Sequence, residues 1–200
     1  MPAPDQQKQL AAAFATLDAA NAADPRHVAT GGDEVPYELL YARRMTEELD
    51  RFSPDAPLPL RLAARAQHLE RWRSPREDYP MDRTGYLRWR EDLKKFHAER
   101  ARELLSAVGY TDEVLDRVAF LLQKKRLKRD EDTQTLEDVI CIVFLKYYAA
   151  EFAAEHPREK VVDILHKTLR KMSERGKEAA LASDLPPAVR AMVGEAMEIS

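Results

Sequence analysis

The sequence predicts an all-α, single-domain protein, a bundle of about seven to eight helices. Ala, Leu, Glu, Lys and Arg dominate its composition, and only 6 of its 200 residues are glycine. These residue types favour helix. Apolar residues recur at helical spacing along most of the chain, and no segment shows the alternation expected of a strand. A chain of this length can bury a core without disulfides or metals.

Prolines separate the first three predicted helices. An Ala-rich segment, residues 5–22, predicts the first helix, and a loop with paired glycines follows it. Pro36 can occupy the first turn of a second helix, which runs to about residue 50. Three prolines within residues 53–59 break that helix. The third helix is predicted over residues 60–73.

Glycine and N-cap signals set the next two helices. After a Pro-rich loop over residues 74–83, a long fourth helix opens at Gly85 and ends at Gly109, a residue type favoured just past a helix end. Thr111 is a suitable N-cap for a fifth helix, with two acids in its first turn. Five basic residues in positions 124–129 follow, and we expect them to form a solvated turn.

The remaining chain predicts three more helices. The sixth begins near Thr133, and its residues 139–145 are apolar on every side, so it should be the buried central helix, with Cys141 as a core thiol. A seventh helix starts after Pro157 and continues to residue 181, and a short eighth starts at Pro186. The predicted organisation is an N-terminal helix and loop, a core, and C-terminal helices over residues 1–35, 36–155 and 156–200.

Composition excludes several protein classes. The net charge is −3, so no general nucleic-acid binding is expected. A single cysteine excludes an intramolecular disulfide and fits a reducing compartment. No signal-peptide pattern and no membrane-length apolar run is present. These features predict a cytoplasmic protein without membrane contact.

The stretch from Ala63 to His97 contains the strongest functional signal. It holds both tryptophans and two of the five histidines. His68 and His97, together with Asp138 at the start of the most apolar helix, form a candidate metal set, because side chains from facing helices build metal sites in all-helical proteins. A divalent iron, manganese, nickel or zinc ion would suit them. Structural hydrogen bonding or ion pairing is the alternative explanation.

Cationic and aromatic residues crowd the same stretch. Arginine grips phosphate oxygens with two parallel hydrogen bonds, and aromatic rings beside it can stack a base or a sugar. The alternative is a solvated helix edge with Arg stacked on Trp. The candidate phosphate-binding residues are Arg65, Arg71, Arg73, Arg76, Trp72, Tyr79 and Lys124.

Four segments of the chain are distinctive: LLYARRM, AARAQHLERWRSPREDYPMDRTGYLRWREDLKKFHAE, QTLEDVICIVFL and KTLRKMSERG. They resemble an uncharacterised family of bacterial and fungal proteins with a conserved domain of unknown function, sometimes mislabelled as related to glutamyl-tRNA synthetase. The resemblance covers about residues 17–185. No synthetase-type nucleotide motif accompanies it.

The helical order also resembles the HD superfamily of metal-dependent phosphohydrolases, which implies an HD-like core. By that resemblance His68 is the first metal ligand, His97 the histidine of the His-Asp pair and Asp138 the last aspartate. The chain departs from the pattern, since Ala98 stands where the paired aspartate belongs and Glu99 points to another helix face. A second register, with His97 first and Gln123-Lys124 at the pair, abolishes the metal site.

Together these observations predict a metal-dependent hydrolase of phosphoester or nucleotide-type substrates. A metal-bound water would be the nucleophile. Arg71 and Lys124 would stabilise the developing charge, with the other arginines holding the phosphate. Two alternatives stay open: a non-catalytic HD-like module that binds a nucleotide or RNA through the same arginines, and a helical interaction protein, because Arg and Trp are enriched at interface hot spots.

Overall fold

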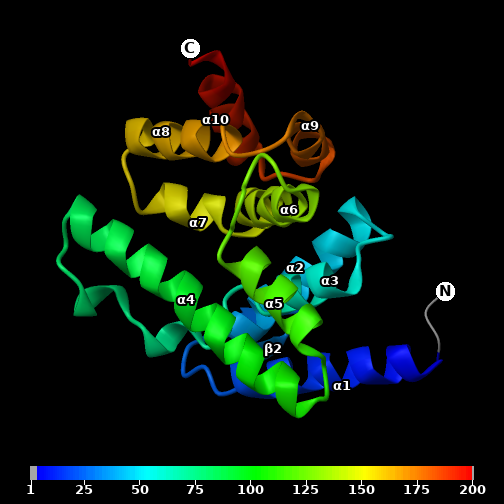
Figure 1. Ribbon diagram of the computed structural model, residues 1–200. Coiled ribbons are helices and arrows are strands. Elements are labelled where there is room, and N and C mark those ends of the chain that lie inside the picture. Colours follow the sequence, from blue (N-terminus) through cyan, green and yellow to red (C-terminus); the bar gives the residue numbers. More distant parts are fainter. Residues whose placement is uncertain (1–3, 200) are drawn as a thin grey trace. The chain divides into compact units, whose positions relative to one another are not determined.

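The computed structural model describes residues 4–199 and confirms the predicted all-α fold, with one two-stranded sheet as the exception. The chain divides into two compact units (Figure 1). Unit 1 comprises the residues up to Glu47 and Asp55–Lys125, and unit 2 comprises Glu48–Pro54 and the residues from Arg126 onward. Among residues 4–199, no helix is both long enough and apolar enough to cross a membrane.

Unit 1 is built around helix α5, which packs against α3 and α4, while α1 packs against the same two helices (Figure 1). Helix α2 begins in this unit and its last turn belongs to unit 2. The elements are α1 (Pro4–Asn21), β1 (His27–Thr30), β2 (Asp33–Pro36), α2 (Tyr37–Phe52), α3 (Leu58–Arg65), the 3-10 turns η1 (Arg71–Arg73) and η2 (Arg76–Asp78), α4 (Arg83–Ala107) and α5 (Asp112–Leu122).

The predicted loop after the first helix is an antiparallel hairpin of β1 and β2, so the absence of strands was a wrong expectation. Val28 pairs with Val35 in its register. Gly31 and Gly32 have φ of 60° and 94°, the left-handed values that a tight hairpin turn requires. Four residues a strand are too few to display an alternating pattern.

The third helix is shorter than predicted, because α3 ends at Arg65 and not at residue 73. Residues 66–70 form turns, and Glu70 adopts φ of 50°, which a continuing helix does not allow. Its backbone N–H donates to Asn21 Oδ1 at 2.9 Å. His68 therefore lies in a turn between α3 and η1.

Helix α4 starts where a side chain caps it. Asp82 Oδ1 accepts the Gly85 N–H at 2.7 Å, and a Cβ on Gly85 would lie 2.1 Å from the Pro80 carbonyl oxygen, so only glycine fits there. The predicted end at Gly109 is confirmed, since this residue has φ of 91° just past the helix. Trp89 Nε1 donates to the Ser74 carbonyl at 2.9 Å and ties the preceding loop to α4.

Unit 2 is centred on the predicted apolar helix. Val139, Cys141, Ile142, Val143 and Leu145 are buried there, which confirms the core position of the thiol. Helix α6 packs against α7 and α9, and α10 packs against α7 and α8. The elements are α6 (Glu131–Tyr147), α7 (Ala149–Ala154), α8 (Arg158–Leu169), α9 (Glu174–Ala182) and α10 (Pro187–Glu198).

The seventh predicted helix is two helices, α8 and α9, so a single helix to residue 181 was wrong. A tertiary contact causes the break. Asp138 on α6 accepts the Ser173 backbone N–H at 2.8 Å and the Ser173 hydroxyl at 2.5 Å. Ser173 Oγ in turn accepts the Gly176 N–H at 3.0 Å, so Ser173 is the N-cap of a new helix.

Candidate functional site

Four ionisable side chains meet in the interior of unit 1, at the centre of the stretch singled out by sequence. Glu38 comes from the first turn of α2, His68 from the turn after α3, Arg71 from η1 and His97 from the middle of α4. The ring centroids of the two histidines lie 6.1 Å apart. Clusters of ionisable groups with perturbed pKa values are candidates for functional sites.

The contacts of His68 fix its protonation state. Arg71 Nη1 lies 3.0 Å from His68 Nε2, and a guanidinium can only donate, so Nε2 carries the lone pair. The proton is then on Nδ1, which lies 3.3 Å from Glu38 Oε2. Tyr41 stacks on the ring at 3.9 Å. Burial and the nearby charges, first that of Arg71, hold the pKa of His68 well below its ordinary value, so the ring is neutral at pH 7.

His97 is neutral as well, and one of its ring nitrogens is unused. Nδ1 lies 2.9 Å from the Leu69 carbonyl oxygen and must donate to it, which leaves the lone pair on Nε2. This buried Nε2 has no hydrogen-bond partner among residues 4–199. Burial, with a smaller effect of the His68 charge, lowers the pKa of His97 to about 3. The site therefore contains a buried hydrogen-bond acceptor held at a fixed position.

Glu38 is the residue that the sequence reasoning missed. It is fully buried, its Oε1 accepts from Arg26 at 2.9 Å, and Arg26 also pairs with Asp24. Burial raises the pKa of Glu38, while Arg71 and Arg26 oppose that shift. A signal was present, because Glu38 falls on the same helical stripe as the buried Met45.

Replacing Glu38 by glutamine is expected to lower the free energy of unfolding at pH 7 by about 2 kcal/mol. The two arginines lose the negative charge that faces them in the interior, although the amide oxygen still accepts a hydrogen bond. Urea unfolding measures the loss. Glu47→Gln, an exposed position on the same helix, is the matched control and should stay within about 0.5 kcal/mol of wild type. Equal effects of the two substitutions would contradict this account of Glu38.

Positive charge exceeds negative charge around His68. Arg71, Arg90, Lys124 and Arg26 all lower the pKa of His68 by their charge. Arg71 is packed over the ring of Trp89 at 4.9 Å, and burial lowers the pKa of its guanidinium. The predicted stacking of Arg on Trp is thus present, with Trp89 as the ring. The predicted site residues Arg71 and Lys124 both belong to this surrounding set.

The other predicted arginines make contacts within unit 1. Arg65 grips Asp18 with two hydrogen bonds of 2.7 and 2.6 Å. Arg73 donates to Glu70 at 2.8 Å. Three backbone carbonyls of the Pro-rich loop accept from Arg76, so this side chain fixes the loop.

Of the two predicted aromatic residues, Tyr79 bonds to α4 and Trp72 lies in η1. The Tyr79 hydroxyl donates to Asp92 at 3.3 Å. Trp72 is half-buried in η1, and the Arg71 guanidinium beside it in sequence packs on Trp89. The arrangement singles out Arg71 among the predicted arginines as the one directed at the histidines.

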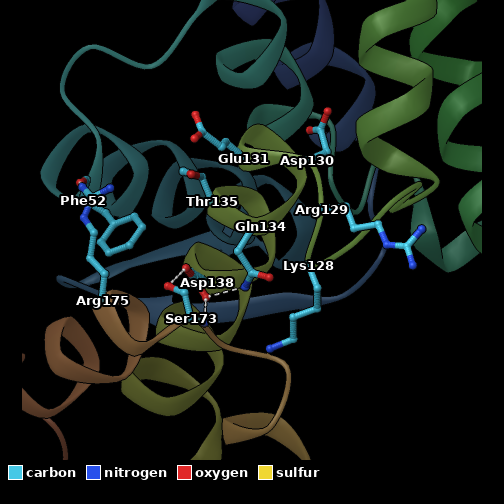
Figure 2. A pocket seen from close by; sticks show the side chains of 10 residues that line it. All are labelled: Phe52, Lys128, Arg129, Asp130, Glu131, Gln134, Thr135, Asp138, Ser173 and Arg175. Carbon is cyan, nitrogen blue, oxygen red and sulfur yellow. Dashed lines mark hydrogen bonds between the residues drawn. The ribbon is translucent and has the colours of Figure 1, made fainter.

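Asp138 lies in unit 2 and lines an open pocket of about 420 Å³ (Figure 2). Figure 2 shows its carboxylate beside Ser173 and Gln134, and Gln134 Nε2 donates to Asp138 Oδ1 at 3.0 Å. Lys128, which lines the same pocket, donates from Nζ to the Met172 carbonyl at 3.0 Å. This carboxylate has a structural task, since it holds the turn between α8 and α9.

The predicted metal ligands do not fit a metal ion in this arrangement. Both ring nitrogens of His68 face other side chains, and both oxygens of Asp138 accept hydrogen bonds from within unit 2. Over the described residues 4–199, no group of three or more His, Cys, Asp or Glu side chains is placed to hold a metal. Binding of iron, manganese, nickel or zinc stays a prediction.

Comparison with known proteins supports the resemblance at the level of the uncharacterised family. No curated protein and no solved structure matches the chain. One family does match, over residues 11–193, and this span includes every residue of the site in unit 1. The chain therefore belongs to the family described as Domain of unknown function (DUF4202).

Proposed function

We propose that unit 1 binds a small phosphorylated molecule at Arg71 and hydrolyses its phosphoester. The observation that carries the proposal is the partner of the Arg71 guanidinium. This largely buried cation donates to a neutral ring nitrogen of His68, not to a carboxylate oxygen.

A buried guanidinium that shares its facing carboxylate with a second cation is unfavourable. Removing such a charge from water costs several kcal/mol unless an anion faces it. The charge of Glu38 acts on Arg71, but Glu38 Oε1 already accepts from Arg26. Arg71 has five N–H donors, a number that suits the oxygens of a phosphate. The His68 side chain keeps 21% of its surface exposed, so an anion can reach this point from solvent.

The unused lone pair of His97 supports hydrolysis as the reaction. In the proposed step a water oxygen bonds to phosphorus while the P–O bond of the ester breaks. His97 Nε2 accepts a hydrogen bond from the attacking water and orients it. The water releases its proton to solvent, and the departing alcohol oxygen takes a proton from solvent. Arg71 stabilises the negative charge on the phosphoryl oxygens. The resemblance to HD phosphohydrolases points to the same substrate class.

Binding of ribose 5-phosphate, measured by calorimetry, tests the site. Wild type should bind, and Arg71→Gln should bind roughly 10–100-fold more weakly, because a charge-assisted contact is lost. Arg88→Gln, an exposed position on α4, is the matched control and should bind like wild type. No binding by wild type, or equal binding by Arg71→Gln, would refute the proposal.

Release of inorganic phosphate then separates hydrolysis from binding alone. His97→Asn keeps a donor for the Leu69 carbonyl and loses the acceptor that would orient the water, so turnover should stop while binding persists. Wild type that binds without turnover, with EDTA or with added iron, manganese, nickel or zinc, would leave the non-catalytic module as the function. Elemental analysis of untagged protein measures the predicted metal directly.

A further inference from the structure

We propose that the ligand also carries a planar aromatic ring, as a nucleoside monophosphate does, and that this ring lies on Tyr86 and Leu87. The inference rests on the proposed phosphate site at Arg71 and names the substrate class of that site. Tyr86 and Leu87, in the first turns of α4, will be called the apolar shelf.

The apolar shelf is exposed although its helix is packed. Tyr86 keeps 43% and Leu87 56% of its surface accessible, among the few large apolar side chains in the described part of the chain that are so open. The neighbouring Gly85 and Trp89 are buried, so α4 is anchored on one side and presents the shelf on another. A helix fixed in this way holds an exposed ring at a defined position.

Contacts in series connect the shelf to the proposed phosphate site. The ring of Tyr86 lies 6.0 Å from that of Trp89, and the Arg71 guanidinium lies 4.9 Å from the Trp89 ring centroid. Arg71 then reaches His68 Nε2 at 3.0 Å. One side chain, Trp89, thus separates the exposed ring from the cation that would hold the phosphate.

Arg90 links the same two places by its charge. Its guanidinium lies 5.9 Å from the Tyr86 ring centroid and donates to the Tyr86 hydroxyl at 3.3 Å. Its charge also lowers the pKa of both His68 and Arg71. A ligand that bridges shelf and site therefore meets cations at its anionic end and an aromatic ring with a leucine at the other.

Cations at one end and an aromatic side chain at the other suit a ligand in which a phosphate is attached to a flat ring. Stacking on an aromatic side chain tolerates any base, because each base has a π-face. Leu87 adds apolar contact. A bare phosphate or a sugar phosphate would leave the shelf unused, so the ring should raise affinity.

Calorimetry of the full chain with four probes tests the inference: inorganic phosphate, ribose 5-phosphate, AMP and adenosine. Wild type should bind AMP at least tenfold more tightly than ribose 5-phosphate, since stacking of one base has about this effect. Tyr86→Ala should remove that advantage and leave ribose 5-phosphate unchanged. Tyr86→Phe should retain it. Met197→Ala, an exposed apolar residue in unit 2, is the matched control and should bind all four like wild type.

The outcomes separate this inference from the proposed function. If ribose 5-phosphate binds through Arg71 but AMP binds no better, the phosphate site stands and the shelf is refuted. Equal weakening of AMP and ribose 5-phosphate by Tyr86→Ala also refutes it. If none of the three phosphorylated or phosphate probes binds, both proposals fall.

Discussion

Between pH 7 and pH 4, the protein is expected to lose about 3 kcal/mol of its free energy of unfolding through His97 alone. The folded-state pKa of this imidazole is about 3, whereas its ordinary value is 6.5. Below pH 6.5 the unfolded chain therefore takes up a proton that the folded chain does not, and stability falls as the pH falls. The contribution is complete above pH 6.5 and is lost progressively toward pH 3. His68 acts in the same direction.

Urea unfolding at several pH values, with His97→Asn beside wild type, isolates this contribution. The variant should be less stable at pH 7 but lose less stability on acidification, because it has no imidazole to protonate at this position. An NMR titration that gives His97 a pKa near 6.5 would contradict the buried, neutral ring.

Gly176→Ala is expected to lower the free energy of unfolding by about 3 kcal/mol, because the new methyl group overlaps a buried carboxylate. A Cβ at this position would lie 2.5 Å from Asp138 Cγ and 2.6 Å from its Oδ1. Asp138 would have to move, and the two hydrogen bonds that it accepts from Ser173 would weaken. Thermal and urea unfolding measure the change.

Gly194→Ala is the matched control for this substitution. Gly194 also lies within a helix, α10, but nothing comes within 4 Å of its Cβ position, so alanine should be neutral or stabilise by up to about 1 kcal/mol. In the double variant Gly176→Ala/Asp138→Ala the clash is absent. Its loss of unfolding free energy should therefore be smaller than the sum of the losses in the two single variants. Full additivity would refute the steric explanation.

Helix positions were predictable from sequence where local signals decide them, and not where a distant side chain does. Apolar stripes and Gly109 gave the fourth helix its place and its end. Asn21 bonds to the left-handed Glu70 that lies between α3 and η1, and Asp138 holds the break between α8 and α9, each from far away along the chain. Propensity cannot show such contacts, because they exist only once the helices have packed.

The candidate site was predictable in its residue types but not in its pairings. His68, His97 and Arg71 do come together, and their density within one stretch was the signal. The position of Asp138 before an apolar run suggests a metal ligand, but the same position equally suits a carboxylate that holds a turn. Glu38 was overlooked although an acid on a buried helical stripe needs a cationic partner.

The division of α2 between the two units has a consequence for synthesis on the ribosome. Glu48 and Phe52 leave the ribosome with the first part of the chain, but Lys146 and Tyr147, which donate to Glu48, and Arg175, which packs on Phe52, come much later. At usual elongation rates this delay is on the order of ten seconds. During that time the Glu48 carboxylate has only Arg51 from among its partners, and the Phe52 ring is uncovered, so this end of α2 acquires its final contacts only after α6 and α9 have been made.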